Sequence, residues 1–388
     1  MGQRVRIGFD GSALRRQGKG AERVQTELLK AFAELDAVSE LVVFVPIEAE
    51  QPELPQPPGW RYVHVPMKPL LRWEQLGLPR AARRERLDLV LSTSERAALV
   101  GVRQSVLIFE HPRHRRDRQR EAGATLRQRL VDALTEWLFL FSMRRAAVVV
   151  AASASTAADM ASTREVEVVH LGVGREFSPD PGGAAAARKR VSAPDGYFLH
   201  LASDDPREHN ETVLDALARL AAGGVRPVLV VAGGARLRLP ALQVLAAELG
   251  VAEQVRWLGF QSELDLVDLY RGAIAYVDSS LYEGLPLQPL EAMACGTPTI
   301  ASRASSFPEL VGEAGILVSP GDVDAFADAM RTLLAEPARL TTLREAALTR
   351  ASHFSWSATA ARWLELSLRG STPTQHAHHP HWKRRPKK

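Results

Sequence analysis

The strongest constraint on the fold is a regular alternation of short apolar runs with amphipathic segments over most of the 388 residues. The runs have the length of strands, and segments such as 20–35 between them have helical spacing of apolar residues. Strands that are apolar throughout are typical of parallel sheets covered by helices on both faces. The predicted strands are 5–10, 40–46, 61–66, 87–93, 105–110, 146–153, 166–172, 197–203, 226–234, 254–260, 274–280, 297–302 and 314–320. The sequence therefore predicts an α/β protein with mostly parallel sheets.

The rhythm breaks in the stretch that ends at residue 196, where Pro, Gly and Ala dominate. We interpret 179–196 as a linker between an N-terminal Rossmann-like domain, 1–178, and a second Rossmann-like domain, 197–352. The two domains are expected to face each other across a cleft. In open α/β sheets ligands bind at the carboxyl ends of the strands, so the cleft is the expected site. A C-terminal helix over 353–370 is expected to cross back to the N-terminal domain.

The net charge of +4 comes from the end of the chain. Residues 371–388 form a low-complexity, basic and His-rich tail, which we expect to be disordered. Five of the last six residues are Lys or Arg, and without them the net charge is near −1. The folded part is therefore not a basic body, and we expect no nucleic-acid partner.

Cysteine usage and hydropathy indicate the compartment. Cys295 is the single cysteine, so no intrachain disulfide forms, and it is expected to be a small buried residue. The N-terminus enters a strand-like run without a hydrophobic signal segment. Apolar runs such as 137–141 fall far short of the roughly 20 residues that span a bilayer. We expect a cytoplasmic protein, with peripheral membrane contact left open.

The stretch LYEGLPLQPLEAMACGTPTIAS, 281–302, carries two carboxylates in an otherwise apolar segment. A helix is expected to begin near Pro289, a residue type favoured in a first turn. Glu283 then lies in the loop that faces the cleft, and Glu291 lies in the first helical turn. Taken singly, Glu291 would stabilise a helix N-terminus by about 0.3–1 kcal/mol, and Glu283 would be a solvated loop residue.

Taken as a whole, the stretch resembles the donor-binding signature of family 4 glycosyltransferases, E-G-F-G-L-P-x-L-E-A-M-A. The flanking stretches 259–284, 301–322 and 168–180 also resemble this family. The resemblance implies a GT-B fold: α/β, with two facing Rossmann-like domains, parallel sheets and an interdomain cleft. It implies a retaining hexosyltransferase that needs no metal or other cofactor. The donor would be a nucleoside-diphosphate-sugar and the acceptor a glycan, glycolipid or small molecule, as in mannosyl- and rhamnosyl-type transferases of bacterial glycan assembly.

The resemblance also assigns roles around the two glutamates. Glu283 would bind hydroxyls of the donor sugar, and Glu291 would bind both ribose hydroxyls. The backbone N–H groups of the residues that follow Glu283 would meet sugar or phosphate oxygens beside the helix N-terminus. These residues are Gly284, Leu285 and Leu287. Gly233, at the end of a predicted strand of the second domain, is a further candidate for contact with the donor.

Four more candidates lie further from this signature. The backbone of Trp257 and Leu258 would hold the base, although a tryptophan side chain such as that of Trp257 is more often part of the core than a stacking platform. Gly18 and Gly20 stand in a Gly-rich turn after the first predicted strand, where a phosphate can approach closely, and Lys19 would add charge.

His111 follows a predicted strand where the family often carries a His-Asp pair near the transferred sugar. It is the candidate for that position, and the alternatives are a solvent-facing loop histidine or a shift of the alignment to His114. His111, Arg207 and Glu283 are the candidate catalytic residues.

The sequence departs from the family at the cations that neutralise a leaving diphosphate. The usual Arg and Lys positions hold Ser203 and Glu208. Arg207 would supply one cation and His209 a second one that depends on pH. The alternative interpretation of 204–208 is a helix-capping turn with a surface ion pair.

A second departure is Pro286, which stands where the family has a glycine and has no N–H to donate. The two departures leave a second hypothesis open: a non-catalytic or regulatory GT-B protein with weakened nucleotide-sugar binding. An NAD-dependent oxidoreductase is disfavoured, because no G-x-G-x-x-G follows the first strand. The Arg-rich stretch 111–129 is either a solvated helix face or a surface for an anionic acceptor or a membrane.

Overall fold

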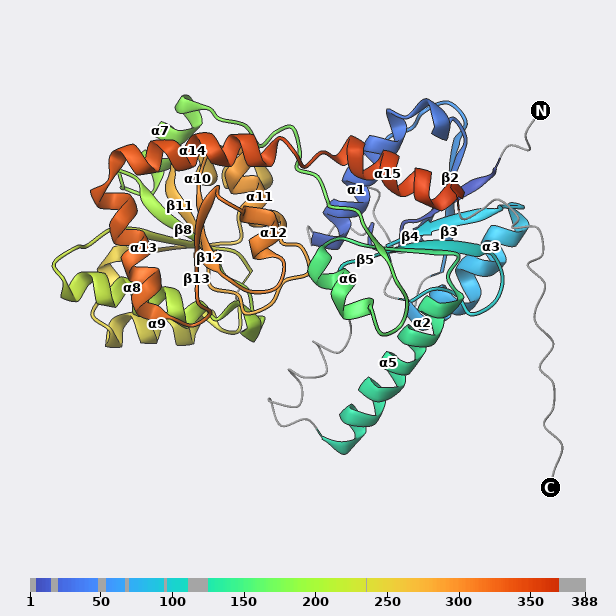
Figure 1. Cartoon of the computed structure of the whole chain (residues 1–388), viewed down its shortest axis with the longest axis horizontal. Helices are drawn as coiled ribbons and strands as arrows, with labels where there is room; N and C mark the ends of the chain where they lie inside the picture. The colour runs from blue at the N-terminus through green and yellow to red at the C-terminus, as the bar shows by residue number, and fades with distance from the viewer. Residues whose placement is uncertain are drawn as a thin grey trace, which may run out of the picture.

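The computed structural model describes residues 5–14, 20–47, 54–66, 70–93, 96–110, 125–234 and 236–369. These residues form two α/β bodies that lie side by side, each built around a parallel sheet (Figure 1). The predicted fold class is confirmed, and every predicted strand overlaps an observed one.

The first sheet has seven strands in the order β3-β2-β1-β4-β5-β6-β7, and all of its neighbouring strands are parallel. Its central strands are apolar and fully buried, as helices on both faces require. The strands are β1 (Ile7–Asp10), β2 (Leu41–Pro46), β3 (Trp60–Val65), β4 (Leu89–Ser92), β5 (Arg103–Ile108), β6 (Val148–Ala151) and β7 (Glu167–Val168). The helices are α1 (Gly20–Ala33), η1 (Asp36–Val38), α2 (Leu70–Arg72), η2 (Trp73–Gly77), α3 (Leu78–Arg84), α5 (Leu126–Arg145) and α6 (Ala154–Met160).

The second sheet has six parallel strands in the order β10-β9-β8-β11-β12-β13. The strands are β8 (Tyr197–Leu201), β9 (Leu229–Ala232), β10 (Val255–Gly259), β11 (Ala273–Asp278), β12 (Thr299–Ser302) and β13 (Gly315–Val318). Its helices are α7 (Pro181–Arg190), η3 (Pro206–Glu208), α8 (Asn210–Ala222), α9 (Leu239–Glu248), η4 (Ala252–Gln254), α10 (Glu263–Gly272), α11 (Leu287–Ala294), α12 (Phe307–Val311), α13 (Val323–Ala335) and α14 (Pro337–Ala351). In both sheets the strand order reverses at the first strand, which opens a crevice at the carboxyl edge.

The segment expected to be an irregular linker is largely a helix. Asp180 caps α7 by accepting hydrogen bonds from the N–H groups of Gly182 and Gly183, and Pro181 occupies the first helical position. The alanine run that follows has high helix propensity, and α7 packs against α10 of the second sheet. The prediction gave the proline and glycines too much weight as helix breakers.

The chain crosses between the two bodies a second time near its C-terminal end. Helix α15 (Trp356–Arg369) returns to the first sheet and packs against α1 (Figure 1). Trp363 of α15 is fully buried, packs against Phe32 with the ring centroids 6.1 Å apart, and donates a hydrogen bond to Ser105 Oγ over 2.9 Å. One continuous apolar cluster runs from the first sheet through α1 and α15 to α11 and the second sheet. Over the described ranges, no helix combines the length and apolar character needed to cross a bilayer.

Candidate functional site

The loop between β11 and α11 brings the two signature glutamates to the carboxyl edge of the second sheet. Helix α11 begins at Leu287, two residues before the predicted start. Pro286 is its N-cap residue, with extended backbone (φ −71°, ψ 133°). Glu291 therefore lies one full turn inside the helix, and the expectation of a first-turn carboxylate at the helix N-terminus is wrong.

Glu283 lies half-buried in this loop, and its backbone is held by two serines. Its N–H donates to Ser305 Oγ over 3.2 Å, and the hydroxyls of Ser305 and Ser306 donate to its carbonyl oxygen. Burial raises the pKa of its carboxyl to about 8, and the nearby charge of Asp278 raises it further, against the opposing effect of Arg207. At neutral pH this carboxyl is mostly protonated, so it can donate as well as accept a hydrogen bond.

Glu291 is buried and bound on both carboxylate oxygens. Tyr270 donates its hydroxyl to Oε2 over 3.0 Å, and Nη1 of Arg23, from α1, lies 2.8 Å from Oε1. Burial raises the pKa of Glu291, while Arg23 and Tyr270 hold the rise back. The carboxylate expected to meet a ribose thus contacts a cation from the other body.

Arg23 is a residue that the sequence reasoning missed. Its guanidinium lies 3.6 Å from Glu176 and 3.7 Å from Glu263, and it covers the ring of Phe177 at 4.7 Å. Burial lowers the pKa of Arg23, but the surrounding carboxylates raise it overall, and Glu291 has the largest effect among them. Nη2 is buried and has no hydrogen-bond partner among the described residues. The sequence feature that could have identified Arg23 is its position one turn after the Gly-rich segment that follows β1.

Ser203 and Glu208, the residues expected at the positions of the family's two cations, bind each other. The carboxylate of Glu208 accepts hydrogen bonds from the N–H and the hydroxyl of Ser203, both over 2.5 Å. Burial raises the pKa of Glu208, and the hydrogen bonds from Ser203 oppose that rise. The two departures from the family pattern are therefore one structural unit and not independent losses.

Arg207 contacts carboxylates from both bodies. Its Nη2 lies 2.9 Å from Asp205, and its Nη1 lies 2.7 Å from Glu110 at the end of β5. Asp205 also caps η3 by accepting from the Arg207 N–H, as the capping-turn alternative predicted. That alternative is wrong about the ion pair, because Arg207 and Glu110 are both only 15% exposed and join the two bodies.

His209 is held in the left-handed region, with φ 50° and ψ 45°, at the N-cap of α8. Its Nδ1 lies 3.1 Å from Thr212 Oγ1, and its carbonyl accepts from Ser279 Oγ. A non-glycine residue in this conformation is uncommon, and it persists here because α8 and the β11 loop both bind its backbone.

Two candidate glycines have steric reasons to be glycine. Gly233 has φ +115°, and an added Cβ would lie 2.3 Å from the carbonyl oxygen of Ala202. At Gly284 an added Cβ would lie 2.0 Å from the carbonyl oxygen of Phe109, at the end of β5. Gly284 is therefore the point where the signature loop comes directly against the backbone of the first sheet.

The remaining candidates differ in how they are placed. The Trp257 side chain packs half-buried against the core of the second sheet, as its alternative interpretation predicted. Leu258, Leu285 and Leu287 pack against the cluster that joins both sheets, with Leu285 buried. Gly20 is the first residue of α1. Gly18, Lys19, His111 and the tail 371–388 lie outside the described residues, as do the first fourteen residues of the arginine-rich stretch.

Further polar contacts join the two bodies around the signature loop. Glu309 accepts hydrogen bonds from the N–H groups of Ala154 and Ser155 at the start of α6, over 2.8 and 3.1 Å, and lies 3.1 Å from His170 Nε2. Burial opposes the ionised form, but these donors lower the pKa of Glu309 overall. Tyr282 donates to Asp159 over 2.9 Å. Both contacts hold the loop edge of the second sheet against α6.

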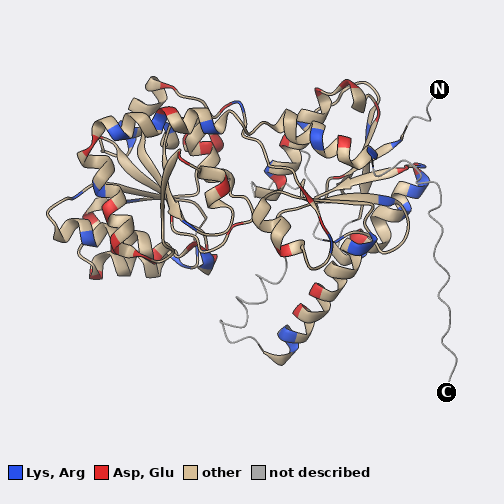
Figure 2. Ribbon diagram, in the orientation of Figure 1, with Lys and Arg blue, Asp and Glu red and all other residues tan. Residues whose placement is uncertain are grey.

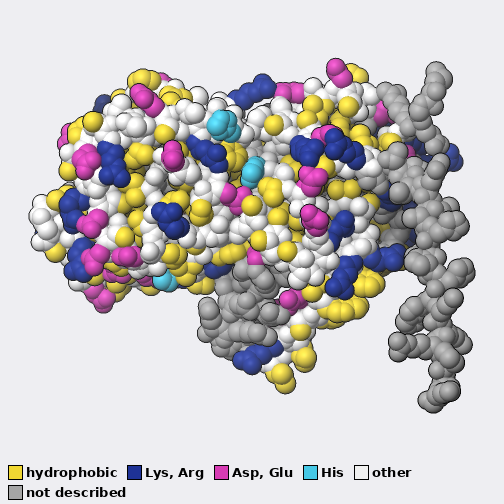
Figure 3. Space-filling model, in the orientation of Figure 1, with side chains coloured by type: hydrophobic (Ala, Val, Ile, Leu, Met, Phe, Trp, Pro, Cys, Tyr) yellow, Lys and Arg dark blue, Asp and Glu magenta, His cyan; other side chains and the backbone are white. Residues whose placement is uncertain are grey.

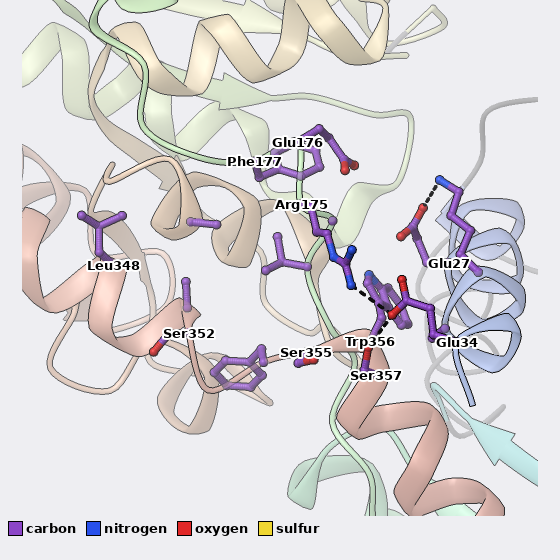
Figure 4. A pocket seen from close by; sticks show the side chains of 17 residues that line it. Glu27, Glu34, Arg175, Glu176, Phe177, Leu348, Ser352, Ser355, Trp356 and Ser357 are labelled. Atoms are coloured by element: carbon purple, nitrogen blue, oxygen red, sulfur yellow. Dashed lines mark hydrogen bonds and ion pairs between the residues drawn. The ribbon is translucent and has the colours of Figure 1, made fainter. Parts of the chain in front are cut away.

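A cavity of about 620 Å³ lies beside this interface, where both chain crossings meet α1 (Figure 4). In Figure 4, Glu34, the residue after the end of α1, binds Arg175 and Ser357, at 3.0 and 3.3 Å. No sequence-predicted site residue that the structure describes lines this cavity. Glu176, which does line it, also lies beside Arg23, so the cavity adjoins the Glu291 site.

Two family profiles match consecutive parts of the chain. "Glycosyltransferase Family 4" matches residues 18–177, and "Glycosyl transferases group 1" matches residues 186–350. Together with the two parallel sheets, these matches define the fold as GT-B. The chain belongs to family 4 of the glycosyltransferases.

Characterised relatives align over roughly half of this chain. The serotype-specific mannosyltransferase WbdA of Escherichia coli is 31% identical over 220 residues, which is 55% of this chain and 26% of that protein. D-inositol 3-phosphate glycosyltransferase 1 of Catenulispora acidiphila is 35% identical over 218 residues, 53% of this chain and 52% of that protein. The matched region therefore spans about a quarter of the first relative and about half of the second.

Solved structures share the fold over nearly the whole chain. Sucrose-phosphate synthase from Thermosynechococcus elongatus has a TM-score of 0.76 and 20% identity, covering 94% of this chain and 99% of its own. Anabaena HepE in complex with UDP and glucose has a TM-score of 0.70 and 18% identity, covering 93% and 98%. At this identity the likeness shows the fold alone.

Replacing Arg23 tests whether the Arg23–Glu291 pair is an energetic unit. Arg23→Met leaves the Glu291 carboxylate buried without its cation, and we expect the free energy of unfolding to fall by about 1–3 kcal/mol. In Arg23→Met/Glu291→Gln the loss should be partly recovered, with a coupling energy of about 0.5–3 kcal/mol in urea unfolding of the four proteins.

The matched control is Arg219→Met, which removes an arginine from an exposed pair with Asp324. We expect it to change stability little. Strict additivity of the Arg23 and Glu291 substitutions would contradict the pairing.

The raised pKa of Glu283 makes stability depend on pH. Between about pH 4.5 and 8 the folded protein holds a proton that the unfolded chain has released, so stability falls as pH rises through this window. Glu283→Gln removes the effect, so the variant should exceed the wild type in stability above about pH 8, and the difference should shrink toward about pH 5. Unfolding titrations across this range measure it, with exposed Glu313→Gln as control. A difference that does not vary with pH would refute the shifted pKa.

Proposed function

We propose that this chain is a retaining glycosyltransferase that moves a hexose-type sugar from a nucleoside-diphosphate-sugar to an acceptor and needs no metal ion. One observation carries the proposal: Glu283 and Glu291 lie on one loop and helix at the carboxyl edge of the second sheet, directly against the first sheet. Gly284 marks that contact, because its Cα lies against the Phe109 carbonyl. In open α/β folds this edge is where ligands bind.

The chemistry of the two carboxyls suits a sugar nucleotide. Protonated Glu283 would donate to one sugar hydroxyl and accept from another, which an ionised carboxylate cannot do. Glu291 would accept from ribose hydroxyls in exchange for its contact with Arg23. Nη2 of Arg23 has no hydrogen bond and lies 3.6 and 3.7 Å from the carboxylates of Glu176 and Glu263, and it would then meet an oxygen of the same nucleotide. Arg23 is thus the cation we propose for the donor site.

The reaction we propose needs no protein nucleophile. The leaving phosphate oxygen would take the acceptor proton on the same face of the sugar, while the protein positions both substrates and excludes water. The name of one relative, a mannosyltransferase, supports a hexose donor. UDP in the HepE structure makes UDP the first nucleotide to test.

A second candidate function is nucleotide-sugar binding without turnover. It is favoured by the Ser203–Glu208 pair, which places a carboxylate where the family has a cation. Arg207, the nearest replacement, is neutralised by Asp205 and Glu110. A leaving diphosphate would therefore find less positive charge here than transfer normally requires.

Calorimetric titration with UDP, GDP and dTDP, followed by hydrolysis assays with the matching nucleotide-sugars, separates the two functions. We expect micromolar binding of one nucleotide and slow turnover of its sugar. Glu291→Ala should abolish binding, whereas the exposed control Glu313→Ala should not, with circular dichroism confirming that both fold. Binding without turnover would establish the second function, and absence of both would refute the transferase.

Restoring the family's cations tests the phosphate site itself. In Ser203→Arg/Glu208→Lys two charged donors replace a carboxylate, and charged hydrogen bonds contribute about 1.5–3 kcal/mol each. We expect nucleoside-diphosphate affinity to rise more than about tenfold, the equivalent of about 1.4 kcal/mol. Glu313→Lys/Ser319→Arg, at two exposed positions, controls for the same change in net charge. Unchanged affinity would mean that the diphosphate lies elsewhere.

Arg207→Ala, measured in parallel, should lower turnover if Arg207 acts on the donor.

A further inference from the structure

Helix α5 carries a row of large apolar side chains that the described part of the chain leaves exposed. Its members, Leu126, Leu130, Leu134, Trp137 and Phe141, are between 39% and 74% exposed. In Figure 1 the helix projects away from both sheets, and Figure 3 shows hydrophobic side chains gathered on its outer part. Exposed apolar side chains elsewhere on the described surface are more scattered along the sequence. We call these five residues the α5 face.

The α5 face is a continuous stripe by helix geometry. Its members are spaced by four, four, three and four residues, so at about 100° per residue they fall within an arc of about 80° and a length of about 22 Å. Trp137 and Phe141 stack on it, with ring centroids 5.4 Å apart. A different side of the helix, with Phe139 and Met143, is fully buried against β5 and β6. Helix α5 therefore has two apolar sides: one is buried in the fold, and the other, the α5 face, is exposed.

Charge is distributed unequally around this helix. Arg127 lies at the N-terminal end of the stripe, and Arg144 and Arg145 lie at its C-terminal end. By helix geometry all three point within about 60° of the centre of the stripe. Asp132 and Glu136 lie on the other side, about 120–160° away from its centre. Figure 2 shows the basic residues at the ends of α5 and the acidic ones between them. The sequence 111–120 that leads toward α5 adds five arginines and one aspartate, and lies outside the described residues.

We propose that the α5 face docks this protein on an anionic lipid bilayer. A stripe of Leu, Trp and Phe with arginines at its flanks matches helices that lie in the interface plane, where Trp is favoured and arginines meet lipid phosphates. A second copy of α5 is a poorer occupant. In an antiparallel pair Arg127 of one copy would face Arg144 and Arg145 of the other, and in a parallel pair each arginine would face itself. Both arrangements bring like charges together, which an anionic surface does not.

The docking surface is separate from the donor site. It lies on a helix of the first sheet that contributes no residue to the Glu283 or Glu291 contacts, so lipid binding does not depend on catalytic competence. The first body would then rest on the bilayer and present the cleft to acceptors at the membrane.

Vesicle flotation of the full chain tests the proposal. Vesicles of phosphatidylcholine alone are compared with vesicles of phosphatidylcholine and phosphatidylglycerol. We expect binding to the anionic vesicles that weakens with salt. Leu134→Gln/Trp137→Gln should lower the partition coefficient more than about tenfold, because burial of each such side chain contributes about 1.5–3 kcal/mol. The matched control is Leu237→Gln/Leu264→Gln, two side chains 84% and 77% exposed on the other body.

A polarity-sensitive fluorophore shows which side of α5 meets the lipid. Cys295 is the single cysteine, and in a Cys295→Ser background Leu130→Cys or Thr135→Cys takes one label. The label at 130, on the α5 face, should shift to the blue on anionic vesicles, and the label at 135 should not.

Three results would overturn the proposal: wild-type protein that stays unbound to anionic vesicles, binding that the α5 variants leave unchanged, or equal binding to neutral vesicles. Concentration-dependent dimerisation in sedimentation that Leu134→Gln abolishes would also overturn it, by assigning the α5 face to a second copy of the chain.

Discussion

The contact between Arg23 and Glu291 is the interaction that links the two bodies at the candidate site. It joins α1, which packs under the returning helix α15, to α11, which carries the signature loop. Removing either charge from water is costly, and the pair persists because Tyr270 supplies a further hydrogen bond and Phe177 covers the guanidinium. In the function we propose, a ligand would take the place of Arg23 at Glu291. Donor binding would then act directly on one of the contacts that hold the two bodies together.

The edge of the second sheet is acidic for a connected reason. The charges of Asp278, Glu208 and Glu110 act on the Glu283 carboxyl, and burial keeps a proton on Glu283 although Arg207 opposes this. The Glu208 carboxylate accepts hydrogen bonds from the N–H and the hydroxyl of Ser203. The replacement of two cations is thus compensated locally, so the fold remains intact whichever function the site performs.

Much of the architecture was predictable from local pattern. Apolar runs bounded by turn residues located the strands. A strand of a parallel sheet is buried on both faces, so nearly all of its side chains have to be apolar. The signature around 281–302 located the edge of the second sheet because it directly follows the predicted strand 274–280. Errors arose where two local signals compete: the Pro-Gly-Ala segment became helix α7 because Asp180 caps it, and α11 began at Leu287 because Pro286 serves as its N-cap. The α5 face could not be recognised from the sequence. The helix has apolar residues on a second, buried side, so its sequence lacks the periodicity of a helix with one apolar side.

The sequence by itself determined the α/β class, the family and the two glutamates, because these depend on residue type and spacing within short segments. Only the tertiary structure decided the partners of those glutamates. Arg23 is 268 positions from Glu291, Glu110 is 97 from Arg207, and Phe109 is 175 from Gly284; no local pattern encodes such contacts. The charge that a carboxyl carries at neutral pH follows from those distant neighbours and from burial, so it too appears only when the two sheets are brought together.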